Sequence, residues 1–210
     1  MTYNEIIDEI KRDIPFVFDL SVKKDRKVRR LVLKASVFPL RIYSFVTSKN
    51  KNRWLLTWEA HNRKNINDNI LFAMICIANH ANGRLAIMPN FNNSKDLSFS
   101  IFLPHFFQRF AERIKIDSTG EDLIRRYFQY NANFGIDIKK EMVSETKYTI
   151  LATGTSTEGV ALGHQLADGS FFFKTFITYE MSKGEQVDTF ARSEENRMQG
   201  HENLLKELGL

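Results

Sequence analysis

The chain contains one cysteine, four prolines and ten glycines in 210 residues. The lone Cys76 excludes an intramolecular disulfide, and its apolar neighbours indicate a buried thiol in a reducing compartment. The most apolar stretch, residues 70–78, is about half as long as the roughly 18 residues that a membrane-spanning helix needs. The N-terminal residues lack the basic and apolar regions of a secretory signal. We therefore expect a cytoplasmic protein with no membrane partner.

Hydrophobic residues make up 43% of the chain and include 18 phenylalanines, so the chain can form a substantial core. The formal net charge is +5 and the pI is about 9.3. This surplus favours anionic partners, although ribosomal and histone-like proteins are far more basic. The position of the cations therefore matters more than their total.

The densest basic cluster follows a predicted first helix, which begins at a capping box formed by Thr2 and Glu5. Ile6, Ile7 and Ile10 fall on one face of this helix. The cations of the cluster are Lys23, Lys24, Arg26, Lys27, Arg29 and Arg30. They either bind a nucleic-acid backbone or belong to a solvated loop.

The rest of the chain changes between strand and helix patterns. The apolar run at residues 70–78, with Asn67 or Asp68 as its cap, predicts a central helix. Pro104, directly after a strand pattern, predicts a sharp junction into another helix. We expect strands within residues 31–46 and at 53–59, 84–88, 97–103, 148–153, 160–166 and 171–178, and further helices at 104–114, 118–130 and 193–210.

These elements predict an α+β fold with a mostly antiparallel sheet and helices packed mainly on one side. No repeat or linker interrupts the pattern, so we expect a single domain over residues 1–210. Residues 1–96 would supply the N-terminal helix, several strands and the central helix, and residues 193–210 a C-terminal helix.

The helix after Pro104 carries a polar edge. His105, Arg109 and Arg113 are four residues apart, so their side chains lie about 5–6 Å from one another. In the first helical turn, the helix dipole and Arg109 disfavour a positive charge on His105. A neutral imidazole beside two guanidiniums offers a proton acceptor and bidentate donors for a phosphate. The opposite, core-facing stripe consists of Phe106, Phe107, Phe110, Ala111 and Ile114.

This combination suits metal-independent RNA cleavage. The reaction needs a base for the 2′-hydroxyl, an acid for the leaving oxygen and cations for the charge that builds on the phosphate. The same pattern is also typical of a solvated helix face, on which Glu112 would form ordinary salt bridges. The residues leave both interpretations open.

Residues of the later strands extend the candidate site. Strand alternation places Lys174 between Phe172 and Phe176, where it either holds a phosphate while the rings stack bases or extends past packed rings to solvent. Thr175 is its neighbour in sequence. Alternation also places His164 among apolar residues, which favours a core histidine over a site residue.

Known cofactor motifs are missing. Residues 154–159 have the glycine spacing of a P-loop, but Val160 stands where the lysine is needed. The five histidines and the cysteine show no zinc-ligand spacing. We expect neither a metal nor another cofactor.

The strand, the helix LPHFFQRFAER and the later strand FKTFIT, in this order, resemble the small metal-independent ribonucleases grouped as barnase, EndoU, colicin and RelE relatives, particularly their phage-associated branch. The likeness covers residues 97–180, a candidate nuclease-like core. It implies RNA as substrate and, for a toxin, a neutralising protein as partner. It also implies a site made of a general base, a phosphate-binding arginine and a sheet residue: His105, Arg109 or Arg113, and Lys174 or Thr175.

The sequence thus predicts RNA cleavage by attack of a 2′-hydroxyl on the adjacent phosphate. One alternative is a non-catalytic module that binds nucleic acid or a protein through its basic face. Another is a regulatory or structural protein whose charges only solvate its surface. Cleavage without added metal would favour the first function, and salt-sensitive binding without cleavage would favour the second.

Overall fold

The computed structural model describes residues 3–66, 70–80, 82–91, 97–132, 135–144 and 147–181. The chain divides into two compact units. Unit 1 comprises residues 1–89 and 120–132, and unit 2 comprises residues 90–119 and 133–210. The single domain expected from the sequence stays a prediction. The predicted helix at 193–210 and the predicted cap residues Asn67 and Asp68 lie outside the described residues.

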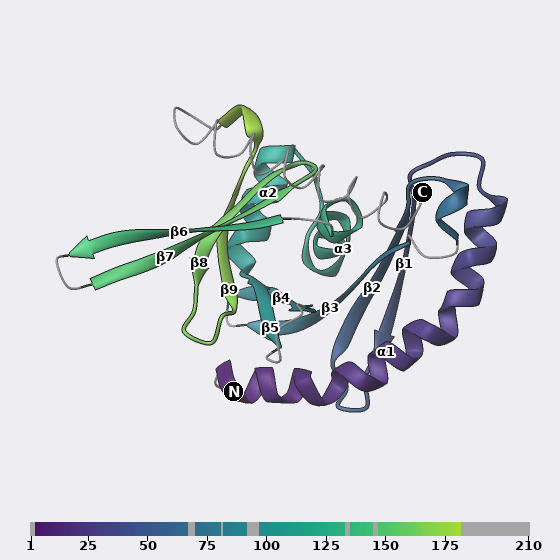
Figure 1. Cartoon of the computed structure of the whole chain (residues 1–210), viewed down its shortest axis with the longest axis horizontal. Helices are drawn as coiled ribbons and strands as arrows, with labels where there is room; N and C mark the ends of the chain where they lie inside the picture. Colours follow the sequence, from purple (N-terminus) through teal and green to yellow (C-terminus); the bar gives the residue numbers. More distant parts are fainter. Residues whose placement is uncertain are drawn as a thin grey trace. The chain divides into compact units, whose positions relative to one another are not determined.

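Unit 1 begins with helix α1 (Tyr3–Lys34), which curves along its length (Figure 1). The helix contains Pro15, whose ring is exposed, and its buried face includes Val28 and Val32. The basic cluster therefore lies within a helix and not in a loop. Residues 31–34 also belong to α1, so the strand pattern predicted from residue 31 begins too early.

The sheet of unit 1 is an antiparallel meander of β1 (Leu40–Thr47), β2 (Arg53–Ala60), β3 (Leu71–His80) and β4 (Gly83–Asn90). A short 3₁₀ turn, η1 (Arg63–Ile66), follows β2. The central helix predicted at residues 70–78 is wrong, because residues 71–78 belong to strand β3. Met74, Ile75 and Cys76 are all buried, so the strand is apolar on both faces. Such a strand has the same apolar run as a buried helix.

Helices α1 and α3 (Gly120–Asn131) cover opposite faces of this sheet. Trp54 donates a hydrogen bond from Nε1 to Asp13 of α1, over 3.4 Å. Its neighbour Arg53 pairs with Glu121 of α3. Because successive residues of a strand point to opposite faces, the two helices lie on different sides. The expectation of helices mainly on one side is not met in this unit.

Unit 2 contains β5 (Ser98–Phe102), α2 (Pro104–Ile114), β6 (Gly135–Ser144), β7 (Lys147–Ser156), β8 (Gly159–Gln165), β9 (Phe171–Ile177) and the 3₁₀ turn η2 (Tyr179–Met181). Its strands lie in the order β5-β9-β8-β7-β6, and β5 pairs with β9 in parallel while the other pairs are antiparallel. The strands predicted at 148–153, 160–166 and 171–178 are confirmed as β7, β8 and β9. Strand β6 was not predicted, and it forms a long hairpin with β7 (Figure 1).

A cluster of phenylalanines forms the core of unit 2. The Phe102 ring stacks on Phe173 with centroids 5.0 Å apart, and the Phe110 ring meets Phe176 edge-on at 5.1 Å. Phe106, which lies between Phe102 and Phe110 in the sequence, is also fully buried. The predicted apolar stripe of α2 is thereby confirmed.

The structure is α+β with mostly antiparallel strands, as the sequence predicts. In the described ranges, no helix combines the length and the apolar character that a membrane crossing requires.

Candidate functional site

Helix α2 presents the predicted polar edge to solvent. Leu103 is extended at the N-cap, Pro104 occupies the first turn, and Lys115 ends the helix in the left-handed conformation (φ 57°). Because Phe106, Phe107 and Phe110 anchor the helix on the sheet, the side opposite them faces outward. His105 is exposed there, at the predicted position.

His105 and Arg109 are in contact. Arg109 donates from Nε to His105 Nε2 over 3.3 Å, so this imidazole nitrogen is the acceptor of the contact. Arg109 also pairs through Nη1 with Glu112 Oε2 at 2.8 Å. This is the salt bridge expected of a solvated helix face, and Glu112 competes with any phosphate for the same guanidinium.

The Arg113 side chain contacts strand β9 and does not join His105 at the solvent-exposed edge of α2. Its Nη1 donates to the backbone carbonyl of Phe176 and lies 3.5 Å from Thr175 Oγ1. The structure therefore brings together two predicted site residues, Arg113 and Thr175. In this arrangement Arg113 ties the end of α2 to β9.

A β-bulge changes the predicted face of Lys174. Leu162 pairs with Thr175 and Gly163 with Phe173, so Lys174 is an extra residue on β9 without a partner in the register. The bulge allows Phe173 and Phe176, three residues apart, both to be buried. The predicted alternation of Phe172, Lys174 and Phe176 on one face is therefore wrong, and Lys174 is exposed.

His164 is partly exposed, so it is not the core histidine that alternation favoured. It pairs across strands with Phe172, and the two rings lie 5.8 Å apart. Phe172 precedes Phe173, which packs toward α2, so His164 lies on the sheet face that α2 does not cover. Partial burial, followed by the charge of Lys174, lowers the pKa of His164. His164 and His105 are thus on different sides of unit 2.

The basic cluster of α1 divides into an outer and an inner group. Arg29 pairs with Asp25 at 2.6 Å and donates to the Ile66 carbonyl, so it is engaged within unit 1. Lys24 is partly buried. The outer group, here called the basic stripe, consists of the exposed residues Lys23, Arg26, Lys27, Arg30 and Lys34.

The basic stripe follows the helical period, and it faces away from the sheet. At about 100° per residue, its five members fall within about 60° of one line along α1. The buried residues Val28 and Val32 point to the opposite side of the helix. In the described part of the chain, no member of the stripe forms a side-chain ion pair.

Unit 1 also has a cavity that the sequence did not predict. It has a volume of about 690 Å³ and lies where β2 and β4 begin and β3 ends. We call it the Glu121 cavity. Its lining residues are Ile6, Glu9, Ile10, Lys51, Asn52, Arg53, Cys76, Ile77, Ala78, Asn79, Arg84 and Glu121.

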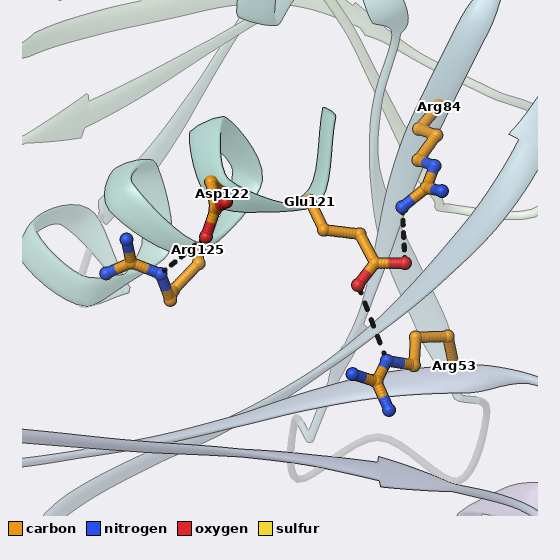
Figure 2. Close-up of polar contacts among 5 residues, drawn as sticks. All are labelled: Arg53, Arg84, Glu121, Asp122 and Arg125. Carbon is orange, nitrogen blue, oxygen red and sulfur yellow. Dashed lines mark hydrogen bonds and ion pairs between the residues drawn. The ribbon is translucent and has the colours of Figure 1, made fainter. Parts of the chain in front are cut away.

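The Glu121 carboxylate bridges two arginines at this cavity (Figure 2). Oε2 lies 3.4 Å from Arg53 Nε, and Oε1 pairs with Arg84 Nη1. Because the three residues belong to β2, β4 and α3, no local motif could reveal their convergence.

The chain matches no model of a known protein family, no curated protein and no solved structure. Across the ranges that the structure describes, no three His, Cys, Asp or Glu side chains converge as a metal site would require.

Proposed function

We propose that the protein binds the phosphate backbone of a nucleic acid through the basic stripe of α1. The observation that supports this function is the alignment of five exposed cations on the solvent face of one helix. Those cations lie within twelve consecutive residues, a rise of about 16 Å along the helix. Double-stranded nucleic acid carries about ten negative charges over that length, at about one per 1.7 Å.

Compensation of the helix dipole explains only part of this arrangement. Cations stabilise the last turn of a helix, where the partial negative charge lies, and Lys34 occupies that turn. Lys23, Arg26 and Lys27 lie about two to three turns earlier, beyond the range of this effect. Phosphate contacts carry no base information, so the proposed binding is independent of sequence.

The salt dependence of RNA binding tests this function. With all five cations on phosphates, the logarithm of the affinity for a labelled 20-nucleotide RNA should fall against log[salt] with a slope of about −3.5, at about −0.7 per contact. In Lys27→Gln/Arg30→Gln the slope should weaken by about 1.4. Fluorescence anisotropy measures both.

A matched control is Lys139→Gln/Lys140→Gln, which removes the same charge from exposed positions on β6. This variant should bind like the wild type. If both double variants lose affinity equally, net charge and not the stripe controls binding, and the proposal fails.

RNA cleavage is the second candidate, because His105 Nε2 acts as an acceptor beside the guanidinium of Arg109. In this proposal His105 takes the proton from the 2′-hydroxyl, and Arg109, once it leaves Glu112, stabilises the phosphate. Arg113, Lys174 and Thr175 remain as possible phosphate contacts from the C-terminal end of α2 and from β9.

Incubation of single-stranded RNA with purified protein in EDTA tests cleavage. His105→Ala should lower the rate about 10²–10⁴-fold, as expected for loss of a general base. Glu112→Gln should raise it by releasing Arg109. An RNA with a 2′-deoxy group at the cleaved position should resist. Equal activity, or equal inactivity, of wild type and His105→Ala would exclude this site.

A further inference from the structure

The Glu121 cavity has one cationic wall. In the strand register, Arg53 pairs with Ile77 and Arg84 with Asn79, two positions that lie two residues apart on β3. Arg53 and Arg84 therefore point to the same sheet face, and both reach Glu121. Two guanidiniums share one carboxylate, so this wall keeps a net positive charge.

Much of the donor capacity of the two arginines is unused. Among the described residues, Arg53 makes one side-chain hydrogen bond, through Nε to Glu121, and Arg84 contacts the same carboxylate through Nη1 alone. The Phe45 ring lies 4.5 Å from Arg53 Cζ and supports the plane of its guanidinium. Both arginine side chains are 41% exposed, so an incoming anion can reach their remaining N–H groups.

The cavity also has an apolar residue on the side of the two arginines. Ile77 of β3 lines the cavity and pairs with Arg53, so its side chain lies on the same sheet face as Arg53 and Arg84. A volume of about 690 Å³ lies within the roughly 300–1,000 Å³ of small-molecule sites. An apolar side chain beside two guanidiniums matches a ligand with an apolar body and one anionic group.

We propose that the Glu121 cavity binds a small organic anion whose carboxylate or phosphate group contacts Arg53 and Arg84. The Glu121 carboxylate occupies the place of that group in the unliganded protein, and the ligand displaces it. This site is independent of nucleic-acid binding by α1 and of RNA cleavage in unit 2.

Calorimetric titration with phenyl phosphate tests the proposal, because this probe combines an aromatic ring with a phosphate. The wild type should bind it, and Glu121→Gln should bind at least tenfold more tightly because the internal competitor is gone. Arg84→Gln should bind at least tenfold more weakly. Benzyl alcohol, which lacks the charge, and inorganic phosphate, which lacks the ring, should both bind more weakly than phenyl phosphate.

Asp122→Asn is the matched control. Asp122 is next to Glu121 but pairs with Arg125 at 3.4 Å, along α3 and away from the two strand arginines (Figure 2). Its removal should leave the affinity unchanged. If Glu121 only anchors α3, Glu121→Gln will lose stability in thermal melts without gaining affinity, and the proposal is overturned.

A second measurement does not depend on the folding of any variant. Both arginines are 41% exposed, so phenyl phosphate should protect Arg53 and Arg84 of the wild type from modification by phenylglyoxal, measured by mass spectrometry of the peptides, while benzyl alcohol should not. Equal modification with and without phenyl phosphate, at concentrations that saturate the calorimetric signal, would place the ligand elsewhere and overturn the proposal.

Discussion

Cys76 shows how the surroundings of one residue set its chemistry. Its side chain is 1% exposed within β3. Burial, followed by the negative charges of Asp13 and Glu9, raises the pKa of the thiol from 9.0 to about 12. Since the thiolate is the reactive form, Cys76 should be unreactive at neutral pH. Burial and the raised pKa thus both disfavour a role for Cys76 as a nucleophile.

The raised pKa predicts a loss of stability in alkali. Between about pH 9 and pH 12 the unfolded thiol loses its proton while the folded thiol keeps it, so the free energy of unfolding falls as pH rises. At pH 10 the loss from this group is about 1.4 kcal/mol. Urea unfolding of wild type and Cys76→Ala at pH 8 and pH 10 measures it.

The difference between the two proteins isolates this group, because lysines and tyrosines titrate in both. The free energy of unfolding of the wild type, relative to that of Cys76→Ala, should decrease by about 1.4 kcal/mol between pH 8 and pH 10. An unchanged difference would mean that the folded thiol ionises as freely as the unfolded one.

Asp13 illustrates what residue-level reasoning misses. Its carboxylate is 1% exposed and accepts hydrogen bonds from Asn50 and Asn52, at 2.9 and 2.8 Å, and from Trp54. A charged residue in an amphipathic helix normally indicates the solvated face. Its partners lie in the β1–β2 turn and at the start of β2, 37 to 41 positions away. The buried Cys76, by contrast, was predictable from its immediate neighbours.

At the scale of the element, α2 was predictable and β3 was not, for a physical reason. In α2, Pro104 fixes the start and the buried phenylalanines follow the 3.6-residue period. In β3, both faces are covered by helices, so the alternation that identifies a strand disappears. The bulge at Lys174 likewise leaves no sequence signal, because it depends on the register with β8.

Helix α2 permits a direct test of which face stabilises the fold. Phe107→Ala and Phe110→Ala should each lower the free energy of unfolding by about 3–5 kcal/mol, because both rings are buried. His105→Ala and Arg109→Ala should change it by no more than about 0.5 kcal/mol, because their contacts are at the surface. Chemical denaturation compares the four variants. Similar losses in both pairs would show that the polar edge also carries stability.

At the scale of the whole molecule, the candidate sites belong to different units. The basic stripe and the Glu121 cavity lie in unit 1, and the contact of His105 with Arg109 lies in unit 2. The sequence located the basic cluster and the polar helix edge because each is local. It could not locate the cavity, since residues 53, 84 and 121 meet only through the fold.

This division predicts that binding and cleavage can be separated by mutation. If α1 only holds RNA and His105 only transfers a proton, Lys27→Gln/Arg30→Gln should raise KM and leave kcat unchanged, since uniform binding is lost. His105→Ala should lower kcat and leave the RNA dissociation constant unchanged. Cleavage kinetics measure kcat and KM, and fluorescence anisotropy measures the dissociation constant of the RNA. If kcat of Lys27→Gln/Arg30→Gln falls by the same factor as its affinity for RNA, the basic stripe contacts the reacting phosphate. That outcome would contradict the separate roles of the two units.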